Sequence, residues 1–326
     1  MKPNIPIVDI SSEADQTSVS IDLYTSRKKI YVRRIEGFFQ RIRGVSLTLL
    51  MGAYFLLAWV RVDGDPLVLF DIGARKFHLF GAVFWPQDFS LLALGLIISA
   101  FGLFFISALF GRVWCGYTCP QTAWTLVFIR LEEFFEGSRN QRMKLDESSA
   151  NINKWLRKGG KHLSWLVIAL ATAITFVGYF YPIRELLNEL STLTLTSGWA
   201  WFWTAFFTLA TYVNAGWMRE QVCIYMCPYA RFQSTMFNEN TMIVGYDKKR
   251  GDPRGSRSRE NKENALGDCV DCHMCVQVCP VGIDIRDGLQ YECIGCALCI
   301  DACDSVMEKM NYPKGLIRYA TEKEFE

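Results

Sequence analysis

The 326-residue sequence has almost no net charge and lacks the short motifs of the common enzyme classes. Its 35 Lys and Arg residues are balanced by 33 Asp and Glu residues, leaving a formal charge of +2. There is therefore no electrostatic case for nucleic-acid binding. No phosphate-binding glycine loop, nucleophile elbow, or flavin or nicotinamide fingerprint is present. Hydrophobic residues make up 51% of the chain and charged residues 21%, which excludes a disordered chain.

Four stretches of the sequence are free of formally charged residues. They run from 44 to 60, 89 to 111, 162 to 183 (counting a histidine as neutral) and 190 to 218. A membrane core requires roughly 20 apolar residues in a helix. One such stretch alone would also fit a buried helix of a soluble protein, but four together are typical of a membrane protein. We therefore expect a mainly α membrane protein with four transmembrane helices in two hairpins, at about 44–61, 89–111, 162–183 and 197–217.

Basic residues are concentrated on one side of these predicted helices. The segment Arg112 to Lys161 contains nine, whereas the loops at 61–88 and 183–198 contain three and one. This bias predicts that both termini and the central loop are cytoplasmic. About forty mostly polar residues precede the first apolar stretch, which argues against a cleavable signal peptide. The segment Lys29–Arg43 mixes basic and apolar residues, and it fits either an interfacial helix on anionic membrane lipid or a plain cytosolic linker.

All 12 cysteines fall on the predicted cytoplasmic side. A reducing compartment argues against disulfides and in favour of metal binding. Eight lie in the tail as two copies of C-x2-C-x2-C-x3-C: Cys269, Cys272, Cys275 and Cys279, followed by Pro280, and then Cys293, Cys296, Cys299 and Cys303. Bacterial ferredoxins bind [4Fe–4S] clusters with this spacing, and the fourth cysteine of each run binds the other cluster.

The spacing predicts two clusters with crossed ligands. We expect cluster 1 to use Cys269, Cys272, Cys275 and Cys303, and cluster 2 to use Cys293, Cys296, Cys299 and Cys279. Structural zinc is the alternative, but zinc sites usually pair two C-x2-C knuckles across a longer loop. The predicted domains are then a cytoplasmic N-terminal segment (1–43), a membrane domain (44–244), a charged, solvated linker (245–267) and a C-terminal 2[4Fe–4S] ferredoxin domain of the α+β class with its tail (268–326).

The other four cysteines form a repeated motif, C-x-Y-x-C-P. Cys115 and Cys119 follow the second predicted span, and Cys223 and Cys227 follow the fourth. In a helix, an i, i+4 pair places both thiols on one face, and the two hairpins could bring all four together. Thiolates suit Cu(I), zinc or an iron–sulfur cluster, whereas the alternative is that these are small buried apolar residues. The repetition favours a copper or redox site, and the spacing leaves the metal open.

Together with these motifs, several further segments resemble the cytochrome c oxidase accessory proteins of the CcoG/FixG/RdxA type, which are membrane-bound polyferredoxins. The segments are Lys29–Arg33, Leu69–Asp71, Arg75–Gly81, Phe84–Phe89, Trp114–Gln121 and Tyr312–Tyr319. The resemblance implies a bacterial inner-membrane protein that reduces Cu(II) to Cu(I) on the cytoplasmic side for assembly of cbb3-type oxidase. The partners it implies are a cytoplasmic electron donor, a copper chaperone or the oxidase assembly machinery, and a second copy of the chain. Family members usually continue into a fifth span and a periplasmic immunoglobulin-like domain, which the sequence up to Glu326 does not contain.

Two other functions fit the same motifs. A quinol-linked membrane ferredoxin subunit would pass electrons to a respiratory reductase, because related proteins of nitrate and nitrous oxide respiration share these motifs. A metallochaperone would bind copper without transferring electrons. Copper-dependent reoxidation of reduced clusters distinguishes the expected copper reductase from both alternatives.

Overall fold

The protein is mainly helical, with a small α+β unit at its C-terminal end. The computed structural model describes residues 29–62, 65–192, 194, 197–256 and 266–325. The longer helices are α1 (Phe38–Leu57), α2 (Phe89–Phe110), α4 (Pro120–Glu136), α5 (Arg139–Glu147), α6 (Ile152–Gly178), α7 (Ile183–Thr192), α8 (Gly198–Thr211), α9 (Pro228–Met236) and α12 (Leu298–Met310). Short helices are η1 (Pro86–Asp88), α3 (Val113–Tyr117), α10 (Lys248–Gly251), α11 (Met274–Gln277), η4 (Ile285–Asp287) and α13 (Glu322–Phe325), and two π-helical segments are η2 (Tyr212–Met218) and η3 (Val222–Met226).

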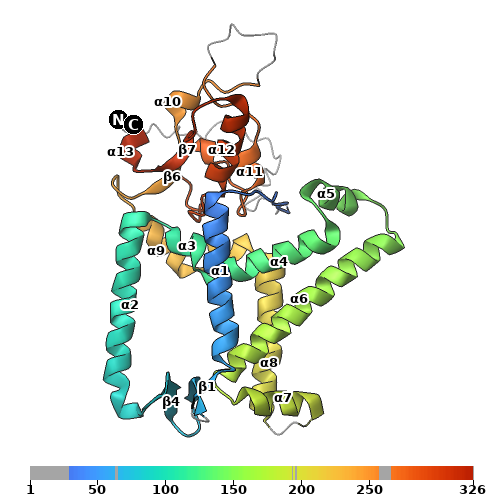
Figure 1. The fold of residues 1–326 in the computed structure, drawn as a ribbon, viewed down its shortest axis with the longest axis vertical. Helices are drawn as coiled ribbons and strands as arrows, with labels where there is room; N and C mark the ends of the chain where they lie inside the picture. Colours follow the sequence, from blue (N-terminus) through green and yellow to red (C-terminus); the bar gives the residue numbers. More distant parts are fainter. Residues whose placement is uncertain (1–28, 63–64, 193, 195–196, 257–265, 326) are drawn as a thin grey trace, which may run out of the picture.

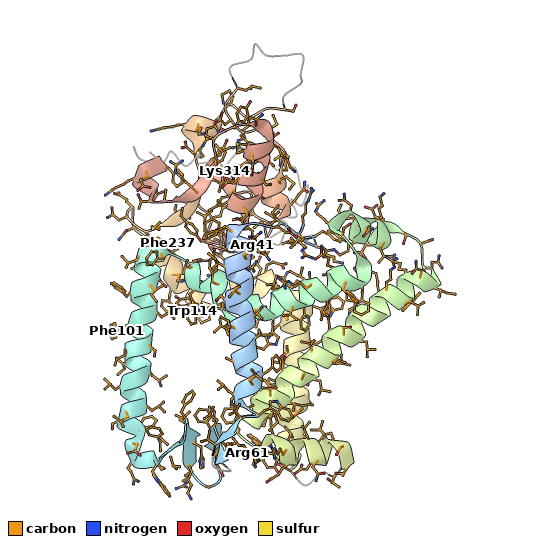
Figure 2. All side chains as sticks on the ribbon, in the orientation of Figure 1. Arg41, Arg61, Phe101, Trp114, Phe237 and Lys314 are labelled. Carbon is orange, nitrogen blue, oxygen red and sulfur yellow. The ribbon has the colours of Figure 1, made fainter. Side chains whose placement is uncertain are left out.

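The apolar stretches form the long helices. In the part of the chain that the structure describes, two helices are long and apolar enough to cross a membrane, 86–110 and α6. Apolar side chains project from α2 in several directions (Figure 2), and Phe101 is 70% exposed. Such exposure is expected of a helix surrounded by lipid and not of a helix in a soluble core. The first and fourth apolar stretches form α1 and the pair α8–η2, and their place as spans stays a prediction.

Small antiparallel sheets connect α1 to α2 at the end of the molecule opposite the C-terminal unit (Figure 1). Strands β1 (Arg61–Val62) and β2 (Asp65–Pro66) pair with each other. Strands β3 (Val68–Asp71), β4 (Lys76–Leu79) and β5 (Ala82–Phe84) form the second sheet, in which Leu69 faces His78. The amide of Phe70 donates to the carbonyl of Tyr179, just beyond α6, which ties the sheet to the second helical hairpin.

The C-terminal unit, which we call the tail unit (residues 243–256 and 266–325), contains α10 to α13 and a two-stranded sheet. Strand β6 (Ile243–Tyr246) pairs with β7 (Ile317–Ala320), and Val244 faces Tyr319. The prediction of a solvated linker over 245–267 is therefore wrong for its first part, while 257–265 lies outside the described residues. The reason is local: Ile243, Val244 and Tyr246 favour a strand, and alternate residues of β6 are buried against the tail-unit core.

A carboxylate of the tail unit caps α1, the first helix of the preceding helical part (the described residues between 29 and 242), which we call the membrane unit. The amides of Phe39 and Gln40, at the start of α1, donate to Asp301 of α12 at 3.2 and 2.8 Å. The residue before α1 is Gly37, and a Cβ there would lie 2.2 Å from the Asp301 side chain. The cap satisfies amides that have no partner within the helix. It also fixes the tail unit to the amino-terminal end of α1 (Figure 1).

Replacing Asp301 with alanine is expected to loosen this attachment. Loss of an N-terminal cap costs about 0.5–2 kcal/mol, so the amides of Phe39 and Gln40 should exchange faster with deuterium. The matched control is Glu308→Ala on the same helix, because the Glu308 side chain is 70% exposed. Unchanged exchange at the two amides in the Asp301 variant would contradict the capping role.

Candidate functional site

The eight tail cysteines surround two neighbouring cavities. One cavity is lined by Cys269, Cys272, Cys275 and Cys303, together with Tyr246, Val270, His273 and other residues. The other is lined by Cys279, Cys293, Cys296 and Cys299, with Cys275 and mainly aliphatic side chains between them. The structure thus places each predicted set of four thiols around its own cavity. Cys303 of the second run lines the first cavity, and Cys279 of the first run lines the second.

The same backbone conformation recurs in both cysteine loops. Asp271 and His273 flank Cys272 with positive φ angles of 52° and 54°, and Gly295 and Ala297 flank Cys296 with 63° and 59°. Only glycine adopts this region without cost, so three of the four positions carry strain that the surrounding fold must offset. The repeat winds each C-x2-C-x2-C loop around its cavity, with α11 and α12 beginning immediately after the second left-handed residue.

The cavities suit thiolates only when a cationic group compensates their charge. Burial raises the pKa of Cys303 to about 12 and that of Cys275 to about 11. Burial likewise raises the pKa of Cys279 to about 12 and that of Cys293 to about 11. Bound metal displaces such protons. Among the described residues no three His, Cys, Asp or Glu side chains converge on a point that would hold one ion, and four thiols spread around a cavity fit a multi-atom cluster better.

The remaining four cysteines occupy equivalent places in two helical breaks. Cys115 lies in α3 and Cys223 in η3, while Cys119 and Cys227 are the extended residues that precede α4 and α9. Proline follows each of the latter, at the first helical position, where its missing amide costs nothing. Only the first cysteine of each pair is therefore helical, so the helical geometry that the i, i+4 spacing suggested applies to half of each motif. Negative charge on Cys119, Cys223 or Cys227 would raise the pKa of Cys115, as expected of thiols that lie near one another.

A buried arginine lies between this thiol group and the tail unit. Arg112 is 5% exposed, and its guanidinium donates to the carbonyl of Ala230, while its Nε has no partner among the described residues. Burial raises the pKa of Cys115 to about 12 and that of Cys223 to about 11, and the Arg112 charge opposes the rise at both. The same charge also opposes the rise at Cys293. One guanidinium therefore acts on both thiol groups.

A hydrogen-bond network positions the thiol of Cys115. The Sγ of Cys115 donates to Oε1 of Gln233 at 3.3 Å. The Gln233 amide nitrogen in turn donates to Ser107 and Tyr229 at 3.0 and 2.9 Å. Gln233 is fully buried, so these partners fix its orientation and hence the acceptor that faces Cys115.

The two thiol groups meet where backbone packs directly on backbone. A Cβ added to Gly116 would lie 3.0 Å from Cα of Cys296, and one added to Gly295 would lie 3.2 Å from the backbone of Arg112. The hydroxyl of Tyr117 donates to the carbonyl of Cys296 at 3.3 Å. The loop that carries Cys293 and Cys296 therefore rests directly on the first C-x-Y-x-C-P motif, so the second cavity, not the first, lies next to the membrane unit.

A buried ion pair positions the second motif. Glu132 of α4 is fully buried, and its Oε2 lies 2.6 Å from Nη2 of Arg219 and 3.7 Å from Arg142. Lys29 lies 3.3 Å from the other oxygen. Burial acts to raise the pKa of Glu132, but Arg219 and Lys29 hold it below its ordinary value. Arg219 has a positive φ of 43° and begins the turn that leads to Cys223.

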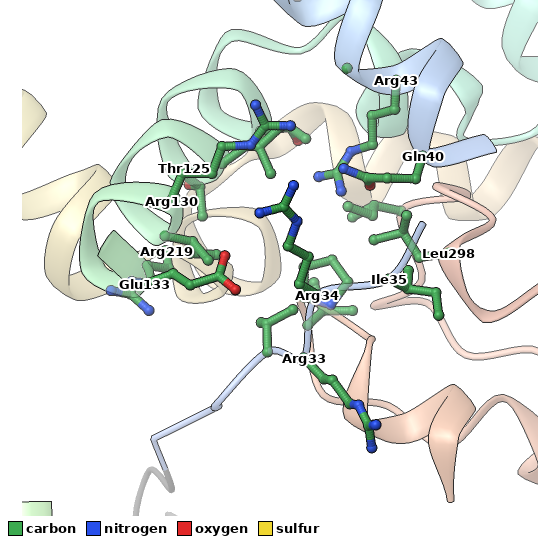
Figure 3. A pocket seen from close by; sticks show the side chains of 18 of the residues that line it. Arg33, Arg34, Ile35, Gln40, Arg43, Thr125, Arg130, Glu133, Arg219 and Leu298 are labelled. Carbon is green, nitrogen blue, oxygen red and sulfur yellow. The ribbon is translucent and has the colours of Figure 1, made fainter. Parts of the chain in front are cut away.

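A large cavity opens beside both thiol groups. We call it the junction cavity; it has a volume of about 730 Å³ and lies between the start of α1, α4, the second cysteine motif and the tail unit. Figure 3 shows Arg34 and Arg130 reaching into it from opposite walls. Cys223 lines it, and so do Val281, Ile294 and Leu298, which also line the cavity of Cys293 and Cys296. The two cavities thus share a wall.

Sequence reasoning missed the residues that join the two thiol groups. One signal was present: the first motif is Cys-Gly-Tyr-Thr-Cys-Pro, whereas the second has Ile224 in place of Gly116. A glycine in only one copy indicates that this copy has a closer neighbour. Nothing in the local sequence around Arg34, Arg130 or Gln233 indicated that they would lie near the cysteines, because these contacts form only in the folded chain.

Two family models match the chain. A model described as a 4Fe–4S dicluster domain matches residues 218–322, and one described as a 4Fe–4S binding domain matches residues 92–131. The first match contains the tail cysteines together with Cys223 and Cys227, and the second contains Cys115 and Cys119. The iron–sulfur assignment of the tail unit agrees with the sequence prediction.

Curated relatives match nearly the whole chain. Nitrogen fixation protein FixG of Rhizobium meliloti is 43% identical over 310 residues, which cover 93% of this chain and 59% of the relative. Protein RdxA of Cereibacter sphaeroides is 44% identical, covering 92% and 64%, and Protein RdxB of the same organism is 41% identical, covering 95% and 65%. The chain therefore spans about three fifths of the length of these relatives. No solved structure matches.

Proposed function

The chain is a FixG-type polyferredoxin, related to FixG, RdxA and RdxB over more than nine tenths of its length, and on this basis we propose that it reduces Cu(II) to Cu(I). It is an iron–sulfur electron-transfer protein, and the specific reaction is the proposal. The observation that carries it is the direct contact between the loop of Cys293 and Cys296 and the motif of Cys115 and Cys119. An electron leaving the tail unit meets soft thiol ligands at that contact, and thiolates favour Cu(I).

The proposed ligands of the clusters follow from the two cavities. Cys269, Cys272, Cys275 and Cys303 would hold one [4Fe–4S] cluster, and Cys293, Cys296, Cys299 and Cys279 the other. When bound, each cluster supplies uptake and release of a single electron. The protein contributes the apolar walls, which exclude water, and the hydrogen bonds and charges that tune the potential. Arg286 is one such contribution, because its guanidinium, 4% exposed, pairs with Asp284 and Asp271 beside the first cavity.

The membrane arrangement is part of the proposal. The two apolar helices and the FixG-type relatives indicate a membrane protein. We place it in the inner membrane with four spans, and with both termini and all cysteines on the cytoplasmic side. The tail unit would then be held at the cytoplasmic surface by the Asp301 cap and by the close backbone contacts at Gly116 and Gly295. A cytoplasmic donor would supply electrons at the first cavity, where Cys272 is exposed. Delivery of Cu(I) to cbb3-type oxidase assembly follows from the family resemblance.

Anaerobic titration tests the proposed reaction. The purified protein, loaded with iron and sulfide and reduced, should convert Cu(II) to Cu(I) with one copper reduced per cluster oxidised. A colorimetric Cu(I) chelator and electron paramagnetic resonance would measure both sides of this balance. Clusters that stay reduced on addition of Cu(II) would refute the reductase proposal. Reduction of the clusters by quinol in such a protein would instead support the ferredoxin subunit of a respiratory reductase.

A further inference from the structure

The junction cavity has an excess of positive charge. Its lining includes six arginines and three glutamates: Arg33, Arg34, Arg41, Arg43, Arg130 and Arg219 against Glu36, Glu133 and Glu220. Arg43 and Arg219 make hydrogen bonds to backbone carbonyls of the protein, and Arg219 is paired with Glu132. The guanidinium groups of Arg34, Arg41 and Arg130 make no hydrogen bond or ion pair within the described ranges. These three groups are therefore available to a ligand.

The position of the cavity connects it to the redox site. Cys223 lies in its wall, and Val281, Ile294 and Leu298 line both this cavity and the cavity of Cys293 and Cys296. A small molecule in the junction cavity would thus lie beside Cys223 on one side, and on the other it would lie against the wall that the cavity shares with that of Cys293 and Cys296. Among the described residues that line the cavity none is aromatic, so none of them would stack on a planar ring such as a flavin.

The charge of the lining selects the ligand. A bare divalent cation would be repelled by the three unpaired guanidinium groups and by Arg112 behind the thiols. An anion would be attracted, and a bidentate contact to carboxylate is what a guanidinium makes best. We propose that the junction cavity admits small anions to Cys223, and that copper enters it as an anionic carboxylate complex of Cu(II). The identity of the cargo as copper rests on the proposed copper reduction. The selectivity of the cavity for anions is independent of that proposal.

The redox step balances with one electron. The Cu(II) complex accepts one electron from the reduced tail unit and becomes Cu(I), and one cluster electron previously supplied by the cytoplasmic donor is consumed. No proton is required by this step. Cu(I) prefers thiolate to carboxylate ligands, so the copper passes to the cysteines in a separate step, in which each thiol that binds it loses its proton to water and the anionic ligand is released.

Thiol labelling of the full-length, cluster-loaded protein tests the selectivity without copper. A negatively charged and a positively charged methanethiosulfonate reagent are compared at Cys223 by peptide mass spectrometry, with free cysteine as the reference. We expect the ratio of negative to positive reagent rates to exceed the free-cysteine ratio by ~10-fold or more, because a cleft with an excess of one sign of charge concentrates the oppositely charged reagent. The double variant Arg34→Gln/Arg130→Gln should return the ratio toward that of free cysteine.

The control variant is Arg61→Gln, which removes the same charge at the opposite end of the molecule (Figure 2) and should leave the ratio unchanged. A wild-type ratio equal to that of free cysteine, or one unaffected by the double substitution, overturns the inference.

A second measurement separates the inference from the proposed function. Initial rates of copper reduction are compared for Cu(II) citrate and for Cu(II) bound to a cationic polyamine, at equal free Cu(II). A faster rate with citrate that disappears in Arg34→Gln/Arg130→Gln supports the inference. Equal rates with both complexes overturn it and leave the reductase intact. Reduction of neither complex refutes the reductase, and with it copper as the cargo, while the labelling ratio still decides whether the cavity selects anions.

Discussion

Replacing Cys115, Cys119, Cys223 and Cys227 together with serine is expected to abolish copper reduction while the iron–sulfur signals of the tail unit survive. Serine keeps the approximate size of each side chain but removes the soft sulfur ligand that Cu(I) requires. The four residues lie outside the two tail-unit cavities, which are lined by the other eight cysteines. Iron and sulfide content and the paramagnetic signals of the reduced clusters should therefore match those of the native protein.

The size of this effect follows from the chemistry of the step. Without thiolates near the contact with Cys296, copper has no site at which to receive the electron. The remaining Cu(I) yield should be only what dissolved Cu(II) produces by reacting directly at the exposed Cys272. The matched control is Cys272→Ser, which should weaken the first cluster and leave the thiol group beside Arg112 unchanged. Full copper reduction in the fourfold variant, with clusters intact, would exclude these cysteines as the acceptor site.

Either pair alone provides a finer comparison. Cys115 is held by Gln233 and adjoins Gly116, which touches the loop of the second cavity, whereas Tyr225 of the second motif is 70% exposed. The first motif thus makes the contact with the tail unit, and the second faces the junction cavity through Cys223. We expect Cys115→Ser/Cys119→Ser to slow electron transfer and Cys223→Ser/Cys227→Ser to weaken copper capture. A KM-against-kcat comparison of the two variants distinguishes these effects.

The tail cysteines were predictable from sequence because their chemistry is local. Three thiols within seven residues, followed by a fourth cysteine and a proline, are the ferredoxin spacing, in which the first three thiols bind one cluster. Because the run is repeated, the fourth cysteine of each run can bind the cluster of the other run. The left-handed backbone of the loops was predictable only at Gly295. Asp271, His273 and Ala297 adopt the same conformation without glycine, because the surrounding fold imposes it.

The junction could not be predicted in the same way. Asp301 lies between two cluster cysteines and gives no sequence signal that it caps α1, more than 250 residues earlier. The sequence prediction divides β6 between the membrane domain and the linker, because charged residues follow it closely and its partner strand lies 71 residues further on. Long-range pairings of this kind depend on the three-dimensional arrangement of elements and leave no periodic pattern in the chain. The charge pattern, in contrast, indicates all four apolar stretches, each of which contains a helix in the described part of the structure.

Substituting Gly116 with valine is expected to separate the membrane unit from the tail unit. A Cβ at this position would lie 3.0 Å from Cα of Cys296 and 3.0 Å from the carbonyl oxygen of Ile294. These are backbone atoms, which cannot rotate away as a side chain would. Overpacking of this kind costs about 1–3 kcal/mol. If the cost falls on docking, the docking equilibrium constant decreases by about 5–150-fold, and reoxidation of the reduced clusters by Cu(II) slows as the docked fraction falls.

The matched control for this substitution is Gly102→Val, because an added Cβ at Gly102 of α2 meets nothing within 4 Å. It should reoxidise at the native rate, and both variants should retain iron, sulfide and paramagnetic signals, which shows that the tail unit has folded. Native reoxidation kinetics in Gly116→Val would place the electron route elsewhere. A slow Gly116→Val with a normal Gly102→Val would instead identify the backbone contact at Cys296 as the route, because the substitution removes neither a thiol nor a charge. Electron transfer would then depend on how closely two glycines allow two chain segments to approach.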